Sequence, residues 1–100
     1  MSRYSPKDLD RCRDVIDEID IDLLRLLNRR TEVVEEIGRI KQELKLAIYE
    51  PKREEQVFAN VTGQNHGPLS HDAVKRIFER IIDEMRTVQK DKMLDASATD

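Results

Sequence analysis

Four polar residues lie where helical periodicity predicts apolar side chains: Arg30, Lys41, Glu54 and Gln89. A guanidinium at the position of Arg30 is costly to bury unless an anion meets it. Lys41 follows eleven residues later, three helical turns and about 16 Å along the axis, on nearly the same face. Because no acid in the pattern obviously balances both cations, the sequence predicts a site for a small anionic ligand, with Glu54 and Gln89 supplying one acid and one neutral amide.

Structural interpretations of the same residues stay open at this point. Arg30 can pair with a glutamate of a partner helix and only fix its register. Lys41 can extend from the edge of the apolar face to solvent, and Gln89, near a helix end, can lie on the surface. Cys12 has no histidine near it in the helical pattern, so it is interpreted as a small core residue rather than a nucleophile.

The elements that must position these residues are predicted to be three helices, which makes the fold all-α. The run Ser5-Pro6-Lys7-Asp8 is typical of a helix start, and the apolar period continues without proline to about residue 45. A second helix is predicted over Pro51–Thr62. The third begins after Ser70 as its cap, and its apolar period fades from Asp91. Residues 95–100 are expected to be a frayed end or the stub of a linker.

The first predicted helix carries an apolar seam with alternating steps of three and four residues, which is a heptad pattern. Its members are Leu9, Cys12, Ile16, Ile19, Leu23, Leu26, Val33, Ile37, Ile40 and Leu44. About 40 residues of helix extend roughly 60 Å, whereas a compact domain of this size has a radius of gyration of about 13 Å. One chain cannot cover such a seam, so we expect an intertwined homodimer. Each chain is expected to form one helical domain over residues 1–100, with its core at about 6–90.

Composition excludes several other classes of function. Eighteen lysines and arginines against 21 acids give a net charge of −3, which argues against nucleic acid as a partner. The sequence has no stretch of about 18 apolar residues, and residues 1–10 lack the apolar region of a signal peptide, so we expect no membrane partner and a cytoplasmic location. One cysteine and two histidines do not make a metal-ligand set, so no metal is expected.

Several motifs together resemble the all-helical chorismate mutases, over about residues 7–90. They are Arg13, Arg30, the Ile-Gly-Arg-Ile-Lys run at 37–41, Tyr-Glu-Pro-Lys-Arg-Glu at 49–54, Gly-Pro-Leu at 67–69 and Ile-Phe-x-x-Ile-Ile at 77–82. Members of this family are intertwined dimers, which agrees with the expectation from helix length. The resemblance also implies active sites shared between the two subunits.

The resemblance implies an isomerase that converts chorismate to prephenate in phenylalanine and tyrosine biosynthesis, without a cofactor. In this [3,3] rearrangement a C–C bond forms as an ether C–O bond breaks, and negative charge grows on the ether oxygen. By similarity, Arg30 and Arg13 of the partner subunit would bind the two carboxylates of chorismate. Lys41 and Gln89 would donate to the ether oxygen, and Glu54 would hold the ring hydroxyl.

Three further positions match the family's substrate site less closely. Glu50 and Arg53 correspond to positions near the ring hydroxyl, where Arg53 would orient the acids as much as touch substrate. Glu50 stands where aspartate is common, so its longer arm either shifts the hydroxyl contact or serves as a cap of the second helix. Met85 stands where some relatives have a small hydroxyl residue near a carboxylate, so that contact is expected to be absent or replaced by a backbone group.

Three other functions compete with this prediction. The same cations suit an enzyme of similar fold that eliminates pyruvate from isochorismate. The chain also suits a regulatory domain of a shikimate-pathway enzyme that senses chorismate or prephenate. A coiled-coil dimerisation module, in which Arg30 only fixes the register, needs no ligand at all.

Overall fold

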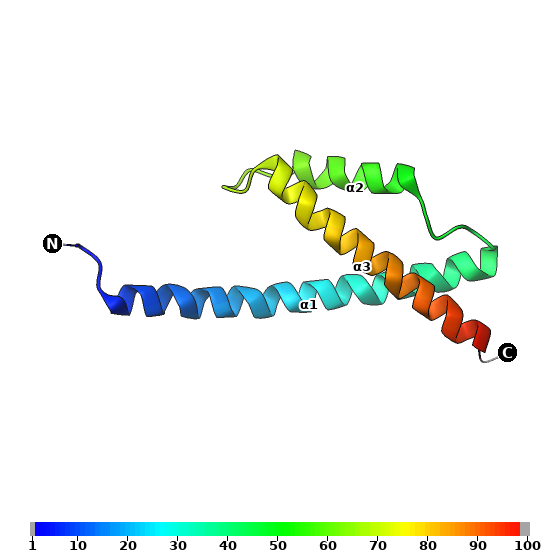
Figure 1. Cartoon of the computed structure of the whole chain (residues 1–100), viewed down its shortest axis with the longest axis horizontal. Helices are drawn as coiled ribbons and strands as arrows, with labels where there is room; N and C mark the ends of the chain where they lie inside the picture. The colour runs from blue at the N-terminus through cyan, green and yellow to red at the C-terminus, as the bar shows by residue number, and fades with distance from the viewer. Residues whose placement is uncertain (1, 99–100) are drawn as a thin grey trace. The chain divides into compact units, whose positions relative to one another are not determined.

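The computed structural model describes residues 2–98, with side chains up to residue 92. These residues form three helices and no strand: α1 (Pro6–Leu44), α2 (Pro51–Gly63) and α3 (His71–Ala98) (Figure 1). The all-α prediction with one very long helix is therefore confirmed. None of the helices in this part of the chain is long and apolar enough to cross a membrane.

The chain divides into two units, the first ending at Glu32 and the second beginning at Val33. The first unit contains the start of α1, where the Asp8 carboxylate accepts a hydrogen bond of 2.7 Å from the Ser5 backbone N–H. This contact and Pro6 at the first helical position confirm the predicted helix start. All seam residues of this unit are exposed: Leu9, Cys12, Ile16, Ile19, Leu23 and Leu26. Cys12 therefore does not lie in a core of the single chain.

The second unit consists of the end of α1 together with α2 and α3. Helices α2 and α3 contact each other, and α3 crosses the end of α1 where Gly38 lies against Gln89 (Figure 1). A β-carbon placed at Gly38 would lie 3.7 Å from Gln89 Cγ, so the two helices are in van der Waals contact there. The buried apolar side chains of the unit come from α1 and α3: Val34, Val74, Ile82 and Met85. The remaining seam residues, Val33, Ile37, Ile40 and Leu44, are exposed.

The end of α1 is closed by a Schellman motif that uses a lysine in place of the usual glycine. The Leu46 N–H donates to the Lys41 carbonyl at 2.8 Å, and the Lys45 N–H donates to the Gln42 carbonyl at 3.3 Å. Lys45 itself has a φ of 58°, in the left-handed region. The motif stops the helix and turns the chain, so that residues 46–50 pass close to the side chain of Lys41.

The two other helix starts follow the sequence prediction. Pro51 occupies the first turn of α2, and Glu50 is the N-cap residue, as one interpretation of it expects, although its side chain makes no capping hydrogen bond. Helix α2 ends at Gly63, one residue beyond the predicted Thr62. At the start of α3, the Ser70 hydroxyl accepts a hydrogen bond of 3.0 Å from the Ala73 N–H, which confirms the predicted cap and its side-chain contact.

Helix α3 is longer than its apolar period predicts, because it continues to Ala98. Residues 95–98 are therefore helical, the interpretation of this end as a frayed end or the stub of a linker stays a prediction, and residues 99–100 lie outside the described part of the chain. The stretch after Asp91 contains no glycine or proline to stop the helix, and it includes alanine, leucine, methionine and lysine, which favour helix. Lys92 also forms an ion pair of 2.9 Å with Glu35 on α1.

The Schellman motif yields a prediction about stability. A residue with a β-carbon is disfavoured in the left-handed conformation, so Lys45→Gly is expected to be about 1 kcal/mol more stable than Lys45→Ala. Urea unfolding at one fixed protein concentration measures the difference. The same pair of substitutions at the exposed helical position Lys90 is the control, and there alanine is expected to be the more stable residue. Equal stability of the two Lys45 variants would contradict the proposed turn.

Candidate functional site

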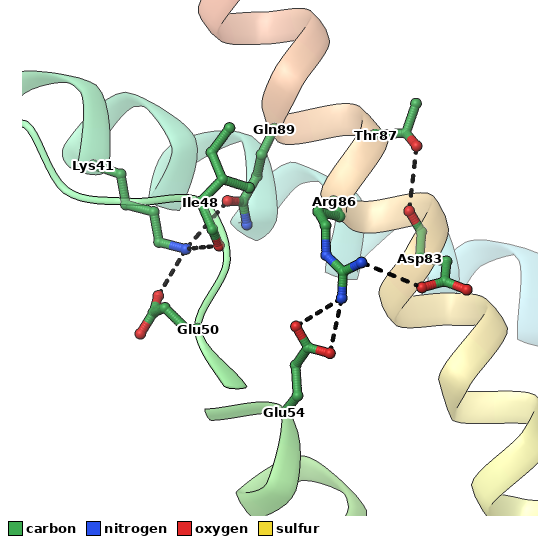
Figure 2. Close-up of polar contacts among 8 residues, drawn as sticks. All are labelled: Lys41, Ile48, Glu50, Glu54, Asp83, Arg86, Thr87 and Gln89. Atoms are coloured by element: carbon green, nitrogen blue, oxygen red, sulfur yellow. Dashed lines mark hydrogen bonds and ion pairs between the residues drawn. The ribbon is translucent and has the colours of Figure 1, made fainter. Parts of the chain in front are cut away.

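The centre of the candidate site is the ammonium group of Lys41, near the end of α1. Lys41 is 6% exposed and its Nζ donates to the Ile48 carbonyl at 2.9 Å and to Gln89 Oε1 at 3.2 Å. Glu50 completes the set with an ion pair of 2.7 Å (Figure 2). A lysine ammonium has three N–H donors. Three acceptors from the connection and from α3 therefore meet three donors.

These contacts decide between the interpretations left open by the sequence. Lys41 does not extend to solvent, and Gln89, which is 9% exposed, does not lie on the surface. The sequence pattern offers no acid that balances both Arg30 and Lys41, and the structure pairs Lys41 with Glu50. The helical pattern could not reveal this pair, since Glu50 reaches Lys41 only after the turn at Lys45.

The ion pair between Lys41 and Glu50 is strongly asymmetric in its exposure to water. The Lys41 side chain is 7% exposed, whereas that of Glu50 is 51% exposed. A ligand oxygen that reaches the ammonium must replace one of its three acceptors. Glu50 is the acceptor that water can resolvate at least cost, so it is the partner that a ligand would displace.

Gln89 is held in a defined orientation by Lys41 and α1. Its Oε1 accepts from the ammonium, and its aliphatic part lies against Gly38. Because the carbonyl end of the amide faces Lys41, its NH2 group points in another direction. The pair therefore combines a cation with a neutral amide donor, which suits an oxygen that gains negative charge.

A second ion pair joins α2 and α3 beside the first. Arg86 Nη2 lies 2.8 Å and 2.7 Å from the two carboxylate oxygens of Glu54, and Nη1 lies 3.6 Å from Asp83 (Figure 2). The Arg86 guanidinium also lies over the ring of Tyr49, 5.2 Å from its centroid. The hydrogen bond to Glu54 raises the pKa of Arg86 above its ordinary value, against the opposing effect of burial. Arg86 is thus a permanent cation at neutral pH.

The two ion pairs lie one helical turn apart. The Glu54 N–H donates to the Glu50 carbonyl at 3.1 Å, so the two acids follow each other along the start of α2. On α3, Arg86 precedes Gln89 by three residues, which places both on one side of the helix. The site therefore carries two acids on one element, a cation and an amide on another, and a lysine on the third.

The other predicted site residues have more varied surroundings. Met85 is buried in the core of the second unit, while Arg53 is exposed and donates to Gln56 at 3.4 Å. Arg13 and Arg30 belong to the first unit. Arg13 is exposed and lies 4.0 Å from Asp10, and Arg30 is half-buried. The placement of these two arginines beside Lys41 stays a prediction.

Arg86 is the residue of this site that sequence reasoning missed. It follows Ile82 by four residues and precedes Gln89 by three, so it interrupts an apolar stripe of α3. The same kind of interruption singled out Arg30 on the first helix. The signal was therefore present in the sequence, but its partner Glu54 lies 32 residues away and is brought close only by the packing of α2 on α3.

The fold and these contacts define an all-helical protein with a buried lysine and amide pair, flanked by two ion pairs. The chain belongs to the family described as chorismate mutase type II, whose model matches residues 12–90. This result confirms the resemblance found in the sequence. Within the described residues, no group of three or more histidine, cysteine, aspartate or glutamate side chains is arranged to hold a metal ion.

Individual relatives agree with the family assignment. A bifunctional chorismate mutase/prephenate dehydratase of Neisseria gonorrhoeae is 37% identical over 78 residues, which are 78% of this chain and 21% of that protein. The chain thus spans about a fifth of the length of this curated relative. The structure of chorismate mutase (form II) from Thermus thermophilus has a TM-score of 0.82 and 34% identity, and the match covers 83% of this chain and 94% of that one. Chorismate mutase from Helicobacter pylori, solved in complex with prephenate, has a TM-score of 0.81 and 28% identity, covering 87% and 94% of the two chains.

The half-buried ion pair between Arg86 and Glu54 is expected to stabilise the fold more than an exposed pair does. A double-mutant cycle with Arg86→Met and Glu54→Gln should give a coupling energy of about 1 to 2 kcal/mol in urea unfolding. The control is the exposed pair of Arg80 and Glu84 on α3, also 2.7 Å apart, for which about 0.5 kcal/mol or less is expected. Equal coupling in the two cycles would contradict the arrangement at Arg86.

Proposed function

We propose that this chain catalyses the rearrangement of chorismate to prephenate. The observation that carries the proposal is the buried Lys41 ammonium with Gln89 bound to it. Family membership and the similarity to a structure solved with prephenate support it. By the family resemblance the product would enter phenylalanine and tyrosine biosynthesis, and the name of the Neisseria gonorrhoeae relative pairs chorismate mutase with prephenate dehydratase.

Catalysis in this proposal is electrostatic. The ether C–O bond of chorismate breaks as the new C–C bond forms, and negative charge develops on the ether oxygen in the transition state. The Lys41 ammonium and the Gln89 NH2 group would donate to that oxygen. Donors that are already oriented in a buried site stabilise the transition state more than the ground state, so they lower the barrier without a nucleophile.

The remaining charged residues would hold the substrate in its reactive, chair-like conformation. Arg30 and Arg13 of the partner subunit would bind the two carboxylates, and Glu54 would accept a hydrogen bond from the ring hydroxyl. Holding both arms of chorismate in place lowers the activation barrier, because the entropy of ordering them is lost on binding and not in the reaction step. Arg53 lies next to Glu54 in the chain and would contribute to the charge near the hydroxyl.

Two residues make the proposed site differ from the pattern of its relatives. Glu50 would leave Lys41 when the ether oxygen arrives, which is feasible because its side chain is 51% exposed. Met85 is buried and apolar, so a backbone group would take the place of the side-chain hydroxyl that some relatives direct at a carboxylate. We therefore propose that the chain catalyses the rearrangement but binds its substrate more weakly than relatives with the hydroxyl residue do.

The proposal includes a homodimer with shared sites. Its support is the exposed seam of α1, which a single chain leaves facing water in both units. Arg13 and Arg30 are 17 residues apart, about 25 Å along one helix, so both cannot reach one small ligand from the same chain. An antiparallel partner with its two-fold axis near Leu23 and Leu24 would bring its Arg13 to the stretch between Arg30 and Lys41.

A cytoplasmic location is part of the same proposal. The exposed Cys12 is the single cysteine of the sequence, so the chain has no internal disulfide. A chain with a single cysteine does not depend on an oxidising compartment for a disulfide of its own, which fits a reducing one.

The two proposed donors can be tested by substitution. Lys41→Ala and Gln89→Ala are each expected to slow prephenate formation at least about a hundredfold, because each removes an oriented donor from the ether oxygen. Turnover of chorismate, followed by its loss of absorbance, measures the effect. Lys90→Ala and Gln42→Ala are matched controls, since they remove an exposed lysine and an exposed glutamine next to the site residues in sequence. Both controls should retain the activity of the natural chain.

Other outcomes of this assay would contradict the proposal in distinguishable ways. Losses of less than tenfold in both site variants would show that the assigned roles are wrong. Faster release of pyruvate from isochorismate than formation of prephenate would identify a lyase. Tight prephenate binding with very slow turnover would identify a sensing domain.

Shared sites predict recovery of activity in mixed dimers. Arg13→Ala and Lys41→Ala should each be inactive alone, but a heterodimer of the two contains one site with both natural residues. Refolding the variants together in equal amounts should restore about a quarter of the natural activity, since half of the dimers are mixed and each has one intact site. No recovery would mean that Arg13 acts within its own chain or not at all.

A further inference from the structure

We propose that Arg86 is a positioning residue that holds the Glu54 carboxylate oriented for the substrate's ring hydroxyl. The inference rests on the proposed function, and it adds a residue to the site. Arg86 acts through Glu54 and does not itself bind substrate.

The contacts of Arg86 support an indirect role. Its Nη2 is within 2.8 Å of both Glu54 oxygens, its Nη1 lies near Asp83, and its Cζ lies over the Tyr49 ring. A guanidinium constrained on three sides has its position fixed by the protein. An acceptor held by such a group keeps its own orientation without further ordering when the ligand binds.

The charge of Arg86 also reduces electrostatic repulsion between Glu54 and the ligand in the proposed site. Glu54 would have to accept a hydrogen bond from a doubly negative ligand, and two like charges at short distance repel each other. The adjacent Arg86 offsets the charge of Glu54, which leaves the carboxylate available as an acceptor. Arg53 does not fill this role, because its described hydrogen bond goes to Gln56 on the exposed side of α2.

The location of the pair connects it to the catalytic donors. Glu54 lies one turn after Glu50, the counter-ion of Lys41, and Arg86 lies three residues before Gln89. The hydroxyl acceptor Glu54 on α2 is therefore next to both ether-oxygen donors, through Glu50 to Lys41 on α1 and through Arg86 to Gln89 on α3. A change at Arg86 is expected to alter recognition of the hydroxyl, while the donors at Lys41 and Gln89 stay in place.

The test compares two probes that differ in one group: a bicyclic diacid that mimics the transition state, and the same diacid without its ring hydroxyl. Calorimetry of the full chain gives both dissociation constants. We expect the natural chain to bind the hydroxylated probe about tenfold or more tightly, as a hydrogen bond to a charged acceptor predicts. In Arg86→Met this preference should fall to within about twofold. Loss of the positive charge of Arg86 weakens the binding of both diacids alike, so the ratio of their dissociation constants isolates the effect of the hydroxyl.

Three further variants make the result specific. Glu54→Gln should lose the same preference, and Arg86→Lys, which keeps a cation but not the planar group, should retain part of it. Arg80→Met removes an exposed arginine of the same helix and should leave the preference unchanged. Circular dichroism checks folding, and Arg86→Gln replaces Arg86→Met if the methionine variant does not fold.

The outcomes distinguish a failure of this inference from a failure of the proposed function. If the natural chain binds neither diacid, the proposed function fails. If it prefers the hydroxylated probe and folded Arg86 variants keep that preference in full, Arg86 is only structural and the inference is overturned. Equal binding of both probes by the natural chain also overturns it, because Glu54 would then not recognise the hydroxyl.

Discussion

Burial of one ammonium group organises the site of this protein. A buried lysine is tolerated when each of its three donors has an acceptor, and Lys41 finds them in the Ile48 carbonyl, Glu50 and Gln89. These acceptors come from the connection after α1, the residue before α2, and α3. The single charge therefore fixes the turn at Lys45, the start of α2 and the register of α3 on α1. A different conformation of any of these segments would leave the Lys41 ammonium buried with one acceptor missing.

The same requirement prepares the chain for the proposed reaction. Lys41 and Gln89 are held in place by the fold, so once Glu50 has left Lys41 on ligand binding, little reorganisation is needed as charge develops on the bound oxygen. The half-exposed Glu50 balances the lysine until then. A second pair, Arg86 with Glu54, balances the acid that would face the ligand. The site thus keeps each buried or half-buried charge paired in the free protein and still presents donors and an acceptor.

Periodicity explains which of these features could be predicted from the sequence. The helix starts at Pro6 and Pro51, the cap at Ser70, and the inward positions of Lys41 and Gln89 all follow from local signals that act within a few turns. The partner of Lys41 could not be predicted in this way, because Glu50 reaches it through a left-handed residue that is usually glycine. Glu54 and Arg86 meet only through the packing of α2 on α3. Helix α3 continues beyond the end of its apolar period, because the residues that follow still have high helix propensity.

In the proposed mechanism, Lys41 exchanges an internal acceptor for the ether oxygen of a doubly negative ligand. A crystal structure of the chain with the hydroxylated bicyclic diacid tests it most directly. We expect the Lys41 Nζ and the Gln89 NH2 group both to lie within hydrogen-bond distance of the probe's ether oxygen, and Glu50 to have moved away from Lys41. A complex in which Lys41 keeps all three internal acceptors while the diacid binds elsewhere would contradict it.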